Sequence, residues 1–294
     1  MQIVPRLAEI PARHEALLCD LWGCLHNGVR AFPEAVAALM DFRAGGGVVI
    51  LLTNAPRPKA DVEAQLSRLG VPKDAWDDIA TSGDATRIAL YRGLIGEKVY
   101  HIGPEKDLGL FAPPPEVDNP ADIRRVPLEE AEGILCTGLV DDRSEAPDDY
   151  RPTLMMAKQL GLKMLCANPD IVVHYGDTVL YCAGALARLY EDMGGEVLYF
   201  GKPWPPVYTL ARNRIAALGR EIPDAGILAI GDGLETDIKG GLGEGFDTLF
   251  ITGGIAAEET GTAPAPDAQP DPARLEALIR KTMLEPTYAM GHLR

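Results

Sequence analysis

Several polar side chains of this 294-residue chain follow directly after short apolar runs and could carry out chemistry. They are Asp20, Thr53 with Asn54, Lys202, and Asp232 with Asp237. Taken singly, each has an ordinary explanation, because aspartates after apolar runs are most often helix caps or turn residues and GKP and GDG are usually turns. If the fold brings the carboxylates together, they repel strongly unless a cation or a lysine offsets their charge. The set therefore predicts a site that holds a metal ion beside a lysine.

The elements expected around these residues alternate between strand and helix. Buried strands are predicted at 16–22, 48–52, 226–230 and 248–251, and helices at 33–43, with Pro33 near its start, and at 59–69, closed by Gly70. Such alternation favours a parallel sheet with helices on both faces. Ligands bind such a sheet at the carboxyl ends of its strands, which is where the polar residues lie.

The middle of the chain has a different pattern. Short apolar runs at 99–102, 134–137 and 163–167 accompany a helical stretch at 153–160, while 111–127 is rich in proline and acidic residues and is expected to be a loop. The chain is expected to rejoin the main sheet at 197–200, and 260–272 to be an exposed connection to a last helix at 273–283. The prediction is an α/β fold: a doubly wound, Rossmann-like parallel sheet formed by 1–86 and 187–294, with a smaller α/β cap domain inserted at 87–186.

Composition restricts the classes of partner. The formal net charge of −15 argues against nucleic acid, whose phosphates require Lys and Arg. The first residues lack the pattern of a signal peptide, and no stretch has the apolar length of a membrane span. The five cysteines have no metal-like spacing, and Cys19, Cys136 and Cys166 lie in apolar runs typical of buried thiols. Together these features predict a cytoplasmic protein with no membrane partner.

Four segments resemble, in order and context, the signature motifs of the haloacid-dehalogenase-like hydrolase superfamily. They are DLWG at 20–23, LLTN at 51–54, GKP at 201–203 and GDGLETD at 231–237. The GKP form and the ANPD segment at 167–170 resemble subclass IIA, in which a large α/β cap lies between the second and third motifs. That subclass contains phosphatases of sugar phosphates, glycerol phosphate, nucleotides and pyridoxal phosphate.

The resemblance implies Mg²⁺-dependent hydrolysis of a small phosphorylated metabolite. Asp20 would attack phosphorus to form an aspartyl-phosphate and would also bind the ion, and Lys202 would offset the negative charge between Asp20 and the phosphate. The other implied site residues are the metal-site residues Trp22 (through its carbonyl), Asp232 and Asp237, and the substrate-binding residues Thr53, Asn54 and Asn168.

One position departs from the family pattern. Where the phosphatases have a second aspartate as general acid and base, this chain has Trp22, whose indole N–H can only donate a hydrogen bond. Losing a positioned acid–base group typically costs about 10²–10⁴ in rate. Cys24 and His26 are the nearby candidates for a substitute, and His26 has the more suitable ordinary pKa.

Three interpretations follow from this departure. The favoured one is a phosphatase that is slow or selective for substrates with a good leaving group, or one that uses a substitute acid, for which His26 is the candidate. The second is a binding or regulatory protein that keeps phosphate and metal affinity but turns over poorly. The third is a phosphotransferase whose acceptor supplies the missing chemistry. The sequence does not identify the substrate, and self-association through the cap, as in many relatives, is left open.

Overall fold

The computed structural model describes residues 1–175 and 178–294, and the chain forms two compact units. The larger unit comprises Met1–Thr53, Glu63–Ala80 and Tyr208–Arg294, and the smaller unit comprises Asn54–Val62 and Thr81–Val207. The domain boundaries expected after residues 86 and 186 stay a prediction. Among the described residues, no helix combines the length and the apolar character needed to cross a bilayer.

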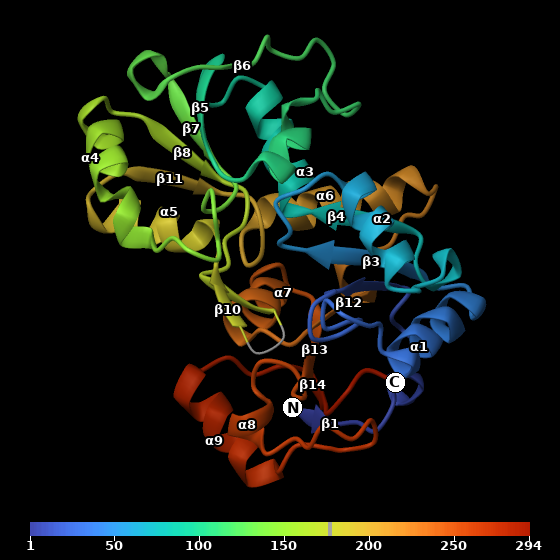
Figure 1. Ribbon diagram of the computed structural model, residues 1–294. Coiled ribbons are helices and arrows are strands. Elements are labelled where there is room, and N and C mark those ends of the chain that lie inside the picture. Colours follow the sequence, from blue (N-terminus) through green and yellow to red (C-terminus); the bar gives the residue numbers. More distant parts are fainter. Residues whose placement is uncertain (176–177) are drawn as a thin grey trace. The chain divides into compact units, whose positions relative to one another are not determined.

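The larger unit contains a seven-stranded sheet. Its strands lie in the order β1 (Gln2–Ile3), β14 (Tyr288–Met290), β13 (Asp247–Ile251), β12 (Ile227–Gly231), β2 (Ala16–Cys19), β3 (Val48–Thr53) and β4 (Asp78–Thr81), which Figure 1 shows in ribbon form. The strand pairs with a described register are parallel. From β2 the chain runs outward through β3 and β4, and β12 later lies on the other side of β2. The predicted doubly wound sheet is confirmed, and its switch point lies between β2 and β12.

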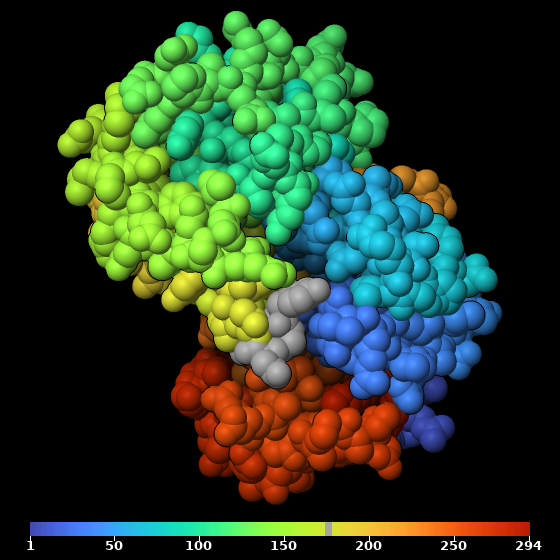
Figure 2. Space-filling view, in the orientation of Figure 1, coloured from blue at the N-terminus to red at the C-terminus, as the bar shows by residue number. Residues whose placement is uncertain are grey.

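Helices connect these strands. Those that belong wholly or mainly to the larger unit are α1 (Pro33–Ala44), α2 (Lys59–Arg68), α6 (Pro205–Ala217), α7 (Lys239–Gly243), α8 (Ala257–Thr260) and α9 (Pro272–Thr282). Pro33 occupies the first turn of α1, and Gly70 follows α2 with a left-handed φ of +79°, as the sequence predicts. The carboxylate of Asp271 caps α9 by accepting from two backbone amides. The space-filling view shows α8, α9 and their connection as one continuous surface (Figure 2).

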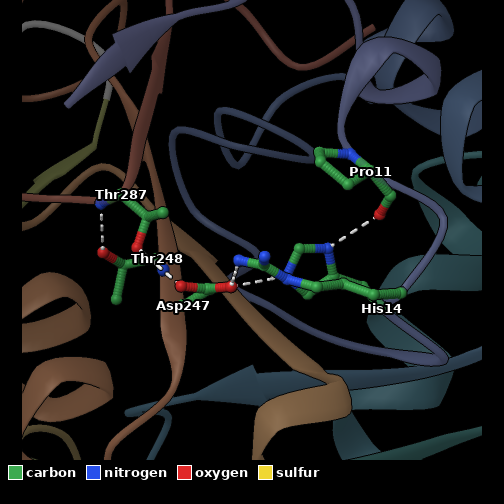
Figure 3. A network of polar contacts seen from close by, with 6 residues as sticks. Pro11, His14, Asp247, Thr248 and Thr287 are labelled. Carbon is green, nitrogen blue, oxygen red and sulfur yellow. Dashed lines mark hydrogen bonds and ion pairs between the residues drawn. The ribbon is translucent and has the colours of Figure 1, made fainter.

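A partly buried polar network fastens the N-terminal segment to the sheet (Figure 3). The carboxylate of Asp247, at the start of β13, accepts hydrogen bonds from Arg13, from Nε2 of His14 at 2.9 Å and from the hydroxyl of Thr287 at 3.1 Å. The other ring nitrogen of His14 lies 3.1 Å from the carbonyl of Pro11. Burial raises the pKa of Asp247, but these hydrogen bonds outweigh it, and the net pKa is lowered. The network therefore favours the ionised carboxylate.

The smaller unit has its own parallel sheet. Five strands lie in the order β11 (Glu196–Tyr199), β8 (Lys163–Cys166), β7 (Gly133–Cys136), β5 (Lys98–Ile102) and β6 (Arg124–Arg125). The helices are α3 (Ser82–Tyr91), α4 (Arg151–Gln159) and α5 (Ala183–Asp192), and an antiparallel hairpin is formed by β9 (Val172–Tyr175) and β10 (Thr178–Tyr181). A core of apolar side chains from the sheet, α4 and α5 holds this unit together. The predicted inserted α/β cap corresponds to this arrangement.

One strand assignment was wrong. The run at 197–200 was expected to rejoin the main sheet, but β11 pairs with β8 in the five-stranded sheet, with Tyr199 opposite Cys166. Its residues are half-buried or exposed, which is the pattern of an edge strand. An apolar run indicates that a strand is present but does not say which of two parallel sheets it joins, and this is the physical reason for the error.

Candidate active site at the switch point

Two carboxylates stand at the carboxyl ends of the adjacent strands β2 and β12. Cys19 pairs with Ile230 at the end of the ladder, and the amide of Asp20 donates to the carbonyl of Ile230 at 2.9 Å. Asp232 follows β12 directly, so the parallel register places the two aspartates side by side. Both side chains are buried, at 7% exposed for Asp20 and 4% for Asp232. The apolar strands that precede them therefore fix the position of both acids.

The two aspartates form a compact group with Cys24. One ligand atom from each of Asp20, Cys24 and Asp232 lies within 4.8 Å of the others. Burial raises the pKa of the Cys24 thiol well above its usual value, and the charges of Asp232 and Asp20 raise it further. A thiol held neutral in this way is a poor metal ligand, whereas carboxylate oxygens are the donors that Mg²⁺ prefers. The oxygen donors of this group therefore fit a hard divalent cation.

Two glycine backbones and one amide hold Asp232 in place. A Cβ atom added at Gly23 would lie 2.1 Å from Oδ2 of Asp232, and one added at Gly254 would lie 2.0 Å from the same oxygen. The amide of Ile255 donates to this oxygen at 2.9 Å. Sequence reasoning missed Gly254 and Ile255, because a glycine pair after a strand has the pattern of an ordinary turn. Their position shows that the loop after β13 is part of the acidic site.

Asp237 lies in the turn that follows Asp232. Its Oδ2 accepts from the amide of Gly233 at 3.2 Å and from the hydroxyl of Thr236 at 3.1 Å. A Cβ at Gly231 would fall 2.0 Å from the carboxyl carbon of Asp237, so this carboxylate is packed closely against the end of β12. The geometry makes Asp237 a residue that shapes the Gly231–Asp237 turn. Its expected support of the metal ion stays a prediction.

The loop after Asp20 folds Trp22 against its own backbone. The rings of Trp22 and His26 meet edge to face with centroids 5.4 Å apart, and a Cβ at Gly28 would lie 2.2 Å from the indole. Gly28, with a φ of +82°, donates its amide to Nδ1 of His26 at 3.1 Å. Because a backbone amide can only donate, the neutral His26 ring carries its proton on Nε2. This hydrogen bond fixes both the orientation and the tautomer of His26.

The residues of the second and third motifs meet within the smaller unit. The side-chain amide of Asn54 donates to Asp170 at 2.9 Å and to the carbonyl of Lys202 at 3.2 Å, and its oxygen accepts from the amide of Lys202 at 2.7 Å. Asn168 accepts from the amide of Asp170 at 3.1 Å, which closes the expected Asn-Pro-Asp turn. Lys202 is only 3% exposed. Asn54 thus holds the lysine loop and the 168–170 turn together.

The structure groups the expected site residues by unit. Asp20, Trp22, His26, Asp232 and Asp237 lie around the carboxyl ends of β2 and β12, and Thr53 is the last residue of β3, all in the larger unit. Asn54, Asn168 and Lys202 lie in the smaller unit. A doubly wound sheet with paired carboxylates at its switch point defines a class of α/β protein suited to binding an anionic ligand together with a cation.

Comparison with known proteins identifies the family within that class. Residues 17–112 match the sequence pattern of haloacid-dehalogenase-like hydrolases, and residues 199–275 match a second pattern of the same hydrolases. The chain is 30% identical over 250 residues to the ribonucleotide monophosphatase NagD of Escherichia coli K12, an alignment that spans 82% of this chain and 88% of that protein. It is 33% identical over 97 residues to the dihydroxyacetone phosphatase of Corynebacterium glutamicum, or 33% of this chain and 34% of that protein.

A solved structure agrees with these matches. The hydrolase of the haloacid-dehalogenase-like family from Brucella suis 1330 superposes with a TM-score of 0.84 at 39% identity, and the match covers 99% of this chain and 100% of that one. This chain belongs to the haloacid-dehalogenase-like hydrolases, and within them to subclass IIA.

Proposed function

We propose that this hydrolase is a Mg²⁺-dependent phosphatase that acts on a small phosphorylated metabolite through an aspartyl-phosphate on Asp20. The observation that carries the proposal is the buried pair of Asp20 and Asp232 at adjacent strand ends, where their oxygens can share one cation. Named phosphatases among the relatives support the same reaction.

The roles of the carboxylates follow from their surroundings. Asp20 would attack phosphorus with one carboxylate oxygen, the bond to the leaving oxygen would break, and water would then release phosphate from Asp20. Asp20, Asp232 and the carbonyl of Trp22 would hold Mg²⁺, with Asp237 in support. Bound Mg²⁺ would neutralise charge on the phosphoryl oxygens. The amide of Ile255 holds the Asp232 carboxylate in place before substrate binds. This carboxylate therefore does not have to be ordered during the reaction.

Further residues are proposed to contact the substrate. Thr53, Asn54 and Asn168 would bind the phosphorylated substrate, and Lys202 would offset the charge on the phosphate. Two of the hydrogen bonds of Asn54 give it a further role in this proposal, because they hold both the backbone N–H and the backbone C=O of Lys202. Asn54 would then act chiefly by positioning Lys202.

The surroundings of His26 favour substrates with good leaving groups. To protonate a leaving oxygen, His26 would have to carry protons on both ring nitrogens, and the amide of Gly28 already occupies Nδ1. With its proton on Nε2, His26 would instead orient a leaving oxygen or a water as a hydrogen-bond donor. Trp22 cannot transfer a proton either. We therefore propose that alkyl phosphates, whose leaving oxygens require protonation, are hydrolysed slowly.

The experiment that tests this function follows phosphate release and intact protein mass together. Pure protein is incubated with Mg²⁺ and 4-nitrophenyl phosphate beside Asp20→Asn and a matched control, Asp41→Asn, which alters an exposed aspartate of α1. Release that persists in Asp41→Asn and vanishes in Asp20→Asn supports the phosphatase. Comparable rates on glycerol phosphate and the aryl phosphate would contradict the predicted selectivity.

The same experiment separates the two alternatives that Trp22 raises. A protein that gains the mass of a phosphoryl group on Asp20 without releasing phosphate would be a phosphotransferase or a phosphate-holding regulator. Absence of both signals would instead identify a binding protein. The location is proposed to be the cytoplasm, because none of the five cysteines, which all fall within the described residues, forms a disulfide.

A further inference from the structure

We infer that the smaller unit carries a second ligand site, which binds a small zwitterion with an apolar body, such as a free amino acid with an aromatic side chain. A hollow of about 320 Å³ is lined by residues of α5 and β11 and by residues close in sequence to Asn168 and Lys202. This volume lies within the range of small-molecule sites. The lining residues differ from those proposed above for catalysis and substrate binding, so this site goes beyond the proposed function.

The lining of the hollow is mostly apolar. Its apolar and aromatic members are Pro169, Ile171, Val197, Tyr199 and Trp204, and the charged members both come from α5. Small-molecule sites typically combine such a lining with a few polar groups that fix the orientation of the ligand. The lining therefore favours a ligand whose larger part is apolar.

Three of the lining side chains are joined into one wall. The ring of Tyr199 stacks on the ring of Trp204, with centroids 4.1 Å apart and 14° between the planes. The hydroxyl of Tyr199 donates to Oε2 of Glu191 at 2.8 Å. This hydrogen bond holds the carboxylate of Glu191 at the aromatic wall. An ionised carboxylate accepts several hydrogen bonds, so Glu191 can also accept from an ammonium group of a ligand.

Arg188 adds a positive charge on the same side of α5. It precedes Glu191 by three residues, and residues at this spacing are neighbours on a helix surface. Burial and the hydrogen bond to Glu191 raise the pKa of Tyr199, whereas the charge of Arg188 acts in the opposite direction, which places the guanidinium within electrostatic range of the Tyr199 hydroxyl. The ion pair of Arg188 with Asp192, at 3.4 Å, engages only part of a group that has five donors. A ligand carboxylate can therefore pair with Arg188 while the ligand ammonium pairs with Glu191.

The hollow adjoins the turn that carries Lys202. The amide of Trp204 donates to the carbonyl of Gly201 at 2.9 Å, and a Cβ at Gly201 would lie 2.6 Å from Cδ of Pro169. Two lining residues thus contact the residue before Lys202, and a ligand that holds them in place restricts this turn. This coupling rests on the proposed function, in which Lys202 offsets the charge of phosphate. The amino acid should then strengthen phosphate binding, and phosphate should strengthen binding of the amino acid by the same factor.

Isothermal titration of the full chain with L-phenylalanine tests the site. Phenethylamine lacks the carboxylate and 3-phenylpropionate lacks the ammonium group, and each should bind about tenfold more weakly than the amino acid. In Arg188→Gln the amino acid should bind only as well as phenethylamine, and in Glu191→Gln only as well as 3-phenylpropionate. The matched control is Arg151→Gln, which alters an exposed, ion-paired arginine of α4 and should keep the binding of wild type.

Three results would overturn the site. They are absence of L-phenylalanine binding at millimolar concentration, equal binding of the amino acid and both analogues by wild type, and equal loss of binding in Arg151→Gln and Arg188→Gln.

The coupling is measured separately. Inorganic phosphate, titrated with Mg²⁺ present, should bind about fivefold more tightly when L-phenylalanine is saturating, and this gain should be absent in Arg188→Gln. Binding of the amino acid without an effect on phosphate affinity supports the site and overturns the coupling. Failure of phosphate to bind, together with absence of Asp20-dependent phosphate release, overturns the proposed function and the coupling, whereas the titration with the amino acid still decides the site.

Discussion

Adding one methyl group at Gly254 should disable the acidic site. The Cβ of Gly254→Ala would lie 2.0 Å from Oδ2 of Asp232, and contacts below 3.0 Å essentially do not occur at real Cβ atoms. The carboxylate or the loop must therefore move by at least about 1 Å, and the hydrogen bond from the Ile255 amide is strained with it. A displacement of that size costs about 10²-fold in activity, and losing the partner of a metal ligand weakens metal binding about 10- to 100-fold.

Two measurements check this prediction. Calorimetric titration with Mg²⁺ reports the affinity of the site, and 4-nitrophenyl phosphate reports turnover. The matched control is Gly243→Ala at the end of α7, where an added Cβ meets no atom within 4 Å. Overpacking is expected to cost Gly254→Ala about 1–3 kcal/mol, so thermal unfolding must show that the variant is folded at the assay temperature. A folded Gly254→Ala protein with the Mg²⁺ affinity and turnover of the control would refute the reasoning.

Three further predictions concern stability. Asp247 has a pKa below its ordinary value of 3.8, so its ionised carboxylate stabilises the fold above that pH, and this stabilisation is lost as the pH falls through the lowered pKa. The denaturation midpoint of Asp247→Asn should therefore fall less steeply than that of wild type as the pH is lowered. Burial raises the pKa of Asp107 from 3.8 to about 6, and its Oδ1 has no hydrogen-bond partner, so ionisation of this residue opposes folding from about pH 3.8 upward, with the full penalty above about pH 6. Asp107→Asn should then stabilise the protein by up to about 3 kcal/mol near pH 8 and by about half as much near pH 5 in denaturant titrations, and equal gains at both would contradict this. Asn54→Ala removes three hydrogen bonds to Asp170 and Lys202 and should cost about 3 kcal/mol, and an unchanged unfolding midpoint would count against the linking role of Asn54.

The position of the paired carboxylates in the candidate site was largely predictable from the sequence. Asp20 and Asp232 each follow an apolar run of strand type, and a parallel sheet necessarily gathers such positions at one edge. The motif order then separated these aspartates from ordinary turn residues. Gly254 and Ile255 could not be found in this way, because they act through close backbone approach and a main-chain amide. Neither a glycine nor a backbone hydrogen bond leaves a chemical signature in sequence.

The fold was predictable where local pattern decides it. Pro33 marks a helix start because its ring restricts φ, and Gly70 marks a helix end because glycine tolerates a left-handed φ, so α1 and α2 were located closely. The sheet that β11 joins was not predictable, since its apolar residues satisfy either parallel sheet equally well. Which sheet accepts an edge strand is decided by long-range packing, here by the pairing of Val197 with Met164.

The pairing of β2 with β12 also determines when the larger unit can be assembled. Leu18 of β2 pairs with Ala229 of β12, so more than two hundred residues must be synthesised before the centre of the sheet is complete. Contacts of such long sequence separation form slowly, because loop closure costs entropy before any pairing is gained. Most of the smaller unit is one continuous segment, Thr81–Val207, and it emerges from the ribosome earlier. During that interval β2 presents an apolar, unpaired edge, which makes the nascent chain a candidate for chaperone protection until β12 arrives.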